Sequence, residues 1–115
     1  MQFFTSPTGN IQCLAGSEGV RCDVRVRQWA HVPNKPSSCV HDWGVSLWVA
    51  VEGRQGALLC VGDAVESPDA ITLECGESLD YGGLYRCDST DTGMTCRVLA
   101  SAHGFLASRE RFQVF

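Results

Sequence analysis

The chain has 115 residues, 44% of them hydrophobic, and a net charge of −4, which fits one globular domain spanning residues 1–115. It holds a single lysine and eight scattered arginines, so a basic patch that follows a nucleic-acid backbone is not expected. No stretch is long and apolar enough to span a membrane.

The cysteine content indicates the compartment. Seven cysteines in a chain of this length are unusual in the cytosol, where thiols stay reduced. The segment that starts at Met1 lacks the basic and apolar regions of a signal peptide. We therefore expect a mature secreted or cell-envelope domain whose leader is absent from this sequence; a cytosolic protein with reduced thiols is the alternative.

A cysteine signature in the first expected strands recurs near the other end of the chain. Residues 11–24 and 85–98 share the pattern apolar-x-Cys-x5-Gly-apolar-x-Cys-x-Val. Apolar and charged residues alternate in Val20–Arg27, as is typical of a half-buried antiparallel strand. Glycine-containing turns between the cysteines complete two predicted β-hairpins.

Each hairpin is expected to carry its own disulfide. A turn at the centre of the first hairpin places Cys13 opposite Cys22, and a similar register places Cys87 opposite Cys96, close enough for disulfides. Zinc ligands are the alternative, but they usually occur as C-x2-4-C pairs, whereas both spacings here are C-x8-C. We predict the two disulfides and no metal or cofactor.

Short apolar runs alternate with turns along the rest of the chain, and helical periodicity is almost absent. This pattern predicts an all-β fold, a compact antiparallel β-barrel or β-sandwich built of disulfide-stapled hairpins, with a pseudo-twofold arrangement as one option. The expected strands are Ile11–Leu14, Val20–Arg27, Val45–Val51, Ala57–Val61, Ile71–Leu73, Leu84–Cys87, Thr95–Ala100, Gly104–Ser108 and Arg111–Phe115.

Three cysteines lie outside the hairpins, and the sequence leaves several pairings open. We predict Cys39–Cys60 as a third bridge, tying a proline-containing loop to the central hairpin. Cys75 is then the free thiol. We expect it to be a small buried apolar residue; a dimer linked through Cys75, or a redox-reactive thiol, is the alternative.

Aromatic residues give the main indication of binding. In Val45–Val51 the aliphatic side chains share one face of the expected strand, and Trp48 points to the other. Tryptophan and tyrosine are enriched at protein interfaces. Trp43, Trp48 and Tyr81 are therefore candidate contact residues, and burial of the tryptophans in a second small cluster is the alternative.

The segment from His103 to Arg109 is the most distinctive string without a cysteine. In a functional interpretation His103 and Arg109 present charge to an anionic ligand; in a structural one Gly104 makes a close backbone contact and Phe105 fills the core. No nucleophile elbow or cysteine-hydrolase context is present. The histidines lack the spacing of metal ligands, and the acidic residues of 63–80 lack the order of a calcium loop.

An ordered set of motifs covers nearly the whole chain. The motifs are Phe4-x-Ser6-Pro7-x-Gly9-Asn10-Ile11-x-Cys13, Val20–Val24, Asp42–Gly44, Leu59–Asp63, Leu79-x-Tyr81-Gly82, Arg86-Cys87-x-Ser89, Gly93–Cys96 and His103-Gly104-Phe105-x-x-Ser108-Arg109. Taken together, they resemble a family of small secreted or lipid-anchored actinobacterial proteins of unknown function. The resemblance implies a disulfide-bonded extracytoplasmic domain and no known reaction. It also implies six recurrent cysteines, so that Cys75 is a departure.

Together these patterns predict a non-enzymatic binding or interaction module at the cell envelope, with a protein as its partner. The alternative is a small secreted enzyme, or an inhibitor of one, with a cleft near His103 and Arg109. A pocket that brings His103 together with an acid or Cys75 favours the enzyme. An exposed patch around Trp48 favours the module.

Overall fold

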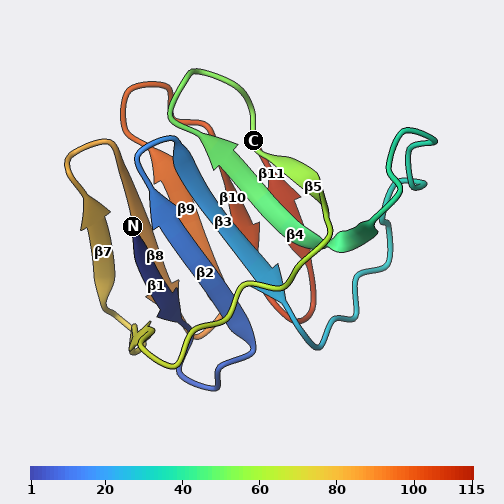
Figure 1. Cartoon of the computed structure of the whole chain (residues 1–115). Coiled ribbons are helices and arrows are strands. Elements are labelled where there is room, and N and C mark those ends of the chain that lie inside the picture. The colour runs from blue at the N-terminus through green and yellow to red at the C-terminus, as the bar shows by residue number, and fades with distance from the viewer.

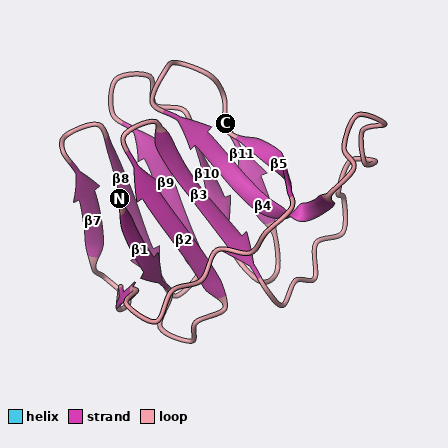
Figure 2. Cartoon of the chain, viewed as in Figure 1, coloured by secondary structure: helices cyan, strands magenta, loops and turns pink.

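Two runs of consecutive antiparallel strands, one from each half of the chain, build two stacked sheets (Figure 1). The computed structural model describes all residues 1–115 and contains no helix (Figure 2). The first sheet has the order β5-β4-β3-β2-β1-β6 and the second the order β11-β10-β9-β8-β7. The all-β prediction is confirmed, and of the two predicted architectures the sheets form a sandwich. The bounds are β1 Gln2–Thr5, β2 Ile11–Gly16, β3 Gly19–Val24, β4 Asp42–Ala50, β5 Ala57–Val61, β6 Ile71–Thr72, β7 Ser78–Tyr81, β8 Tyr85–Thr90, β9 Gly93–Val98, β10 Gly104–Ala107 and β11 Phe112–Val114.

The two runs, β1–β5 (the first meander) and β7–β11 (the second meander), repeat one arrangement around their disulfide-stapled hairpins. In the first meander Phe4 and Leu47 lie opposite the two stapled cysteines. In the second meander Leu79 and Phe105 occupy the same positions. The repeated sequence signature therefore belongs to a larger repeat of strand order and register.

The inward faces of the two sheets form one core. Both hairpin disulfides, Cys13–Cys22 and Cys87–Cys96, are buried in it, and each stabilises the fold by roughly 2–3 kcal/mol in the chain-entropy picture. The third disulfide is Cys39–Cys60, so the structure joins the same three pairs that we predict from the sequence. Other large side chains that are fully buried include Tyr85, Phe4, Phe105, Leu47 and Met94.

Cys75 is unpaired, as predicted, but it is exposed, which corrects the expectation of a buried residue. It lies in a turn after β6 in which Gly76 has a φ of 92°. The amide of Gly76 donates to the carbonyl of Ser89 at 2.8 Å. This turn holds the backbone against β8 while the thiol stays at the surface.

The strand expected over Val20–Arg27 ends at Val24. The side chain of Asn10 explains the end, because its Oδ1 accepts from the amide of Val26 and its Nδ2 donates to the carbonyl of Val26. The chain then turns toward the second sheet, where the indole of Trp29 donates to the carbonyl of Ser108 at 2.8 Å. Two further strands, β1 and β7, have no counterpart among the expected strands.

Residues 62–70, here called the strap, cross the outer face of the first sheet (Figure 1). They have to cross it because β5 and β6, which they connect, are at opposite edges of that sheet, and the inner face is covered by the second sheet. In Figure 1 the strap passes over the end of the sheet where β3 finishes. The other end of the outer face stays uncovered.

The strap is held by a buried carboxylate. Asp23, only 5% exposed, accepts from the Ser46 hydroxyl at 2.5 Å and from the amide of Val65 at 3.1 Å. Arg21 pairs with Asp23 at 2.9 Å and with Asp63 on the strap at 3.1 Å. The alternation in this strand predicts a solvated Asp23, and the strap is the reason that it is buried.

Candidate functional site

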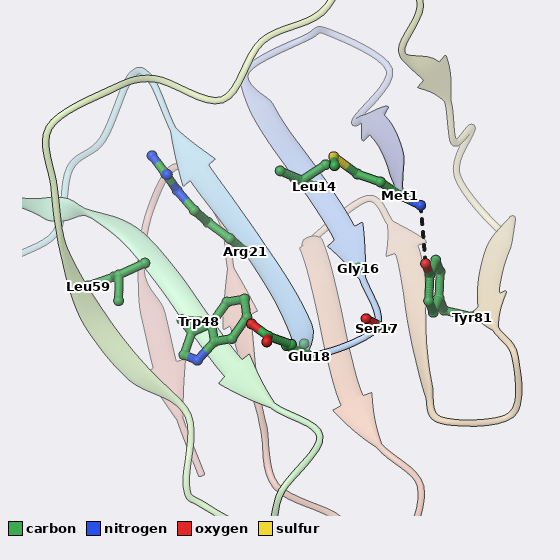
Figure 3. A pocket seen from close by; sticks show the side chains of 10 residues that line it. Met1, Leu14, Gly16, Ser17, Glu18, Arg21, Trp48, Leu59 and Tyr81 are labelled. Carbon is green, nitrogen blue, oxygen red and sulfur yellow. Dashed lines mark hydrogen bonds between the residues drawn. The ribbon is translucent and has the colours of Figure 1, made fainter.

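The uncovered end of the first sheet is hollowed, with a volume of about 500 Å³ (Figure 3). Residues from β2, β3, β4 and β5 form its floor, and the β2–β3 turn and β7 contribute to its rim. We call it the Trp48 hollow. Its lining residues are Met1, Leu14, Gly16, Ser17, Glu18, Gly19, Arg21, Trp48, Leu59 and Tyr81.

The indole of Trp48 lies over Gly19 at the start of β3. A Cβ at position 19 would meet two ring carbons of Trp48 at 2.8 Å and the carbonyl oxygen of Val49 at 2.3 Å. Only glycine therefore allows the ring to rest on the hairpin. The indole N–H makes no hydrogen bond within the chain, so a half-buried aromatic ring keeps a free donor at the hollow.

Leu14 and Leu59 provide the apolar floor on either side of this ring. Leu14 follows Cys13 on β2, and because successive side chains point to opposite faces of a strand, it points outward. It lies opposite Arg21 on β3, which in turn lies opposite Trp48 on β4. The result is an outward-facing apolar surface interrupted by one arginine.

That arginine is not a free charge. Its guanidinium binds both carboxylate oxygens of Asp23, and it also donates to the side chain and the carbonyl of Asp63. Burial alone would lower the pKa of Arg21, but hydrogen bonds and charge from the two aspartates outweigh it and raise the pKa. Arg21 thus anchors the strap and forms a fixed wall of the hollow.

Glu18 differs from Arg21 in having no partner. It is an exposed residue of the β2–β3 turn, next to Gly19, and its carboxylate forms neither a salt bridge nor a hydrogen bond within the chain. Figure 3 shows its side chain reaching toward Trp48. The carboxylate is therefore free to interact with a ligand that occupies the hollow.

Tyr81 marks the opposite rim, where its hydroxyl accepts from the Met1 amino group at 3.2 Å (Figure 3). Its ring stacks on Tyr85 with centroids 5.2 Å apart. The Tyr85 hydroxyl donates to the carbonyl of Gly16 at 2.9 Å. Burial, with the neighbouring Tyr81, raises the pKa of Tyr85 above its ordinary value. This stack fixes the rim to the base of the β2–β3 turn.

Of the aromatic candidates from the sequence, Trp48 and Tyr81 line the hollow together, whereas Trp43 does not. Trp43 lies near the start of β4, where its indole donates to the carbonyl of Pro33 at 2.9 Å. It therefore secures the proline-containing loop. Trp43 and Trp48 belong to the same strand, but they serve different parts of the surface.

His103 and Arg109 lie at opposite ends of β10, and an extended stretch of six residues spans roughly 20 Å. Arg109 lines a second, polar hollow that also contains Cys75, but His103 lines neither hollow. Within the same segment Phe105 is fully buried. A Cβ on Gly104 would meet the carbonyl oxygen of Cys96 at 2.0 Å, as the structural interpretation of the segment expects.

Sequence reasoning missed Leu14, Leu59 and Glu18 as site residues. Leu14 carried a usable signal, because it is an apolar residue at a position where the alternation calls for a polar one. Leu59 follows Leu58, so one of two adjacent leucines has to point outward from a strand. Glu18 carried no signal beyond its place in a turn.

Comparison with known proteins adds one match. A family model described as a family of unknown function (DUF6636) matches residues 1–115. No curated protein and no solved structure matches the chain. Because every regular element of the fold is a strand, the structure offers no helix that could cross a membrane.

Proposed function

Because the chain belongs to a family of unknown function, DUF6636, its role has to be argued from its own surface, and we propose that it is a non-enzymatic, protein-binding module. The observation that carries the proposal is the Trp48 hollow, an uncovered apolar depression that is lined by a fixed tryptophan. Hollows of this kind take a protruding apolar side chain of a partner, and buried tryptophans dominate such contacts.

The second meander supports this interpretation because it shows that the fold does not need apolar residues at every position of this outward face. The outward positions that correspond to Phe3, Leu14, Arg21 and Trp48 in the first meander are assigned by register from each stapled cysteine. In the second meander these positions hold Ser78, Asp88, Thr95 and Leu106. A Phe3–Leu14 pair is thus replaced by a hydrogen-bonded Ser78–Asp88 pair. At Phe3 and Leu14 the first meander is therefore more apolar than the scaffold requires, whereas Leu106, the counterpart of Trp48, is itself apolar and only 9% exposed.

The three intramolecular disulfides point to an oxidising, extracytoplasmic environment. We extend this to the cell envelope or the secreted fraction as the place where the module works. The sequence resemblance to secreted or lipid-anchored actinobacterial proteins favours that location. The partner would then be another envelope or secreted protein.

Affinity capture from envelope extract of the source organism tests the proposal, with the wild type, Trp48→Ala and Trp43→Ala compared. Trp43→Ala is the matched control, because it removes a tryptophan from the same strand outside the hollow. We expect a protein that wild type and Trp43→Ala retain and that Trp48→Ala loses, followed by a measured affinity for the purified pair. Retention that is the same for all three proteins would contradict the proposal.

The alternative of a small enzyme or enzyme inhibitor gains less support, because neither of the two hollows described above unites His103 with Arg109. A dimer linked through Cys75 is a separate matter. The thiol is exposed, so a non-reducing gel of the wild type beside Cys75→Ser shows directly whether that covalent dimer forms.

A further inference from the structure

We infer that the partner inserts an apolar side chain into the Trp48 hollow and places an arginine next to it, paired with Glu18. This inference rests on the proposed function and adds the chemistry of the partner. It comes from the distribution of charge around the hollow, in which one side chain is left without a counterion.

The charged groups at the hollow are the Met1 amino group, Glu18 and Arg21. Arg21 is bound by Asp23 and Asp63 on three of its nitrogens. The Met1 amino group donates to Tyr81 at the rim farthest from Trp48 (Figure 3). No cation of the chain lies within ion-pair distance of Glu18, so its carboxylate is the uncompensated charge of the hollow.

The surroundings of Glu18 favour a cation that is attached to an apolar group. Leu14, Leu59 and Trp48 would hold an aliphatic or aromatic side chain and exclude water from one side of the carboxylate. A charge pair that is partly shielded from water is stronger than a fully solvated one. A free metal ion or a lone ammonium group would leave the apolar floor unoccupied.

Arginine fits this place better than lysine. A guanidinium can lie flat on the exposed face of an indole and bind a carboxylate through two parallel N–H groups. Glu18 and Trp48 lie on the same side of the hollow (Figure 3), so one planar group can contact both. The partner segment is therefore expected to carry arginine beside a leucine-sized or larger apolar residue.

A displayed library of random peptides tests the inference when it is selected against the wild type, Glu18→Gln, Glu18→Arg and Asp91→Asn. Asp91→Asn makes the same change in net charge as Glu18→Gln, on the turn of the second hairpin. We expect the wild type and Asp91→Asn to enrich peptides with an apolar residue next to arginine. Glu18→Gln should keep the apolar preference and lose arginine, and Glu18→Arg should enrich aspartate or glutamate instead.

A synthetic peptide with the enriched sequence then gives the size of the contact. Replacing its arginine by glutamine should weaken binding to the wild type by about fivefold, the effect of one partly exposed ion pair. The same replacement should leave binding to Glu18→Gln unchanged. Circular dichroism and intact disulfides in each variant confirm that the fold is retained.

Selection against Trp48→Ala separates the two proposals. If the wild type enriches no common sequence, or if Trp48→Ala enriches the same one, the proposed function fails and the inference fails with it. If the enriched sequence depends on Trp48 but contains no basic residue, or if its arginine is insensitive to Glu18→Gln, only the inference fails.

Discussion

The first and second meanders share strand order, register and disulfide spacing, yet they present opposite kinds of surface to the outside. The first carries Leu14 and Trp48 around an open hollow and is partly covered by the strap. The second carries Arg86 paired with Asp88 at 2.8 Å, and Arg97 over the Phe115 ring. One scaffold therefore supports an apolar and a charged outer face.

The charged outer face of the second meander contributes little to the stability of the fold. Partial burial would raise the pKa of Asp88, but hydrogen bonds from Ser78 and Arg86 outweigh it and lower the pKa. Such exposed pairs contribute little to stability. The inward faces and the disulfides hold both meanders, so the outer faces are free to differ, and a difference there points to function.

The largest effect is expected from removing the staples, which should destabilise the two meanders equally. The double variants Cys13→Ala/Cys22→Ala and Cys87→Ala/Cys96→Ala should each lose roughly 2–3 kcal/mol, because both bridges have a sequence separation of 9 residues. Urea unfolding measures both values. A large difference between the two losses of stability would show that the two meanders are not equivalent.

Glycines that end the two hairpin turns provide the next test. A Cβ on Gly19 would meet the Val49 carbonyl at 2.3 Å, and one on Gly93 would meet the Ala107 carbonyl at 2.3 Å. Alanine at either position should cost about 1–3 kcal/mol through overpacking. Only Gly19→Ala displaces Trp48, so only this variant should also lose the captured partner. Equal binding by the two variants would argue against the hollow as the site.

Alkaline pH should affect the contact between the meanders, in which Tyr85 of the second binds Gly16 of the first. Because the folded state raises the pKa of Tyr85 above 10, its contribution is complete below pH 10 and is lost as pH rises from there toward the higher folded value. Between pH 8 and pH 11 the urea midpoint of unfolding should fall more for the wild type than for Tyr85→Phe.

The measurement needs a Cys75→Ser background in both proteins, so that the free thiol does not exchange with the disulfides at high pH. An identical fall for both would show that other groups govern the alkaline transition.

The smallest effect on stability is expected from Leu14→Asp, which gives the first meander the residue that the second has at the same place. An outward position tolerates such a change within about 0.5 kcal/mol, but the new charge removes part of the apolar floor. Binding of the partner should therefore be lost while the thermal midpoint hardly moves. A cooperative loss of folding would show that the apolar face has a structural role.

The sequence predicts the stapled hairpins because local registers and alternation carry them. It does not predict β1 and β7. Each is only four residues long, and each is defined by its pairing with the neighbouring hairpin. The Trp48 hollow depends on contacts between residues far apart in the sequence, namely the crossing of residues 62–70 over the sheet and the packing of the Trp48 ring on Gly19. The sequence nevertheless indicates Trp48 as an outward-facing residue, because the aliphatic side chains of β4 share the opposite face of the strand.

The route of the strap also affects the order in which the chain can fold in an oxidising environment. The staple between Cys13 and Cys22 needs only local contacts, but β6 pairs with β1 through Phe4 and Ile71, which closes a much longer loop. The first hairpin can therefore oxidise before β6 is in place. The inner face of the first sheet then stays exposed until the second sheet packs on it, so the greatest aggregation risk falls between these two steps.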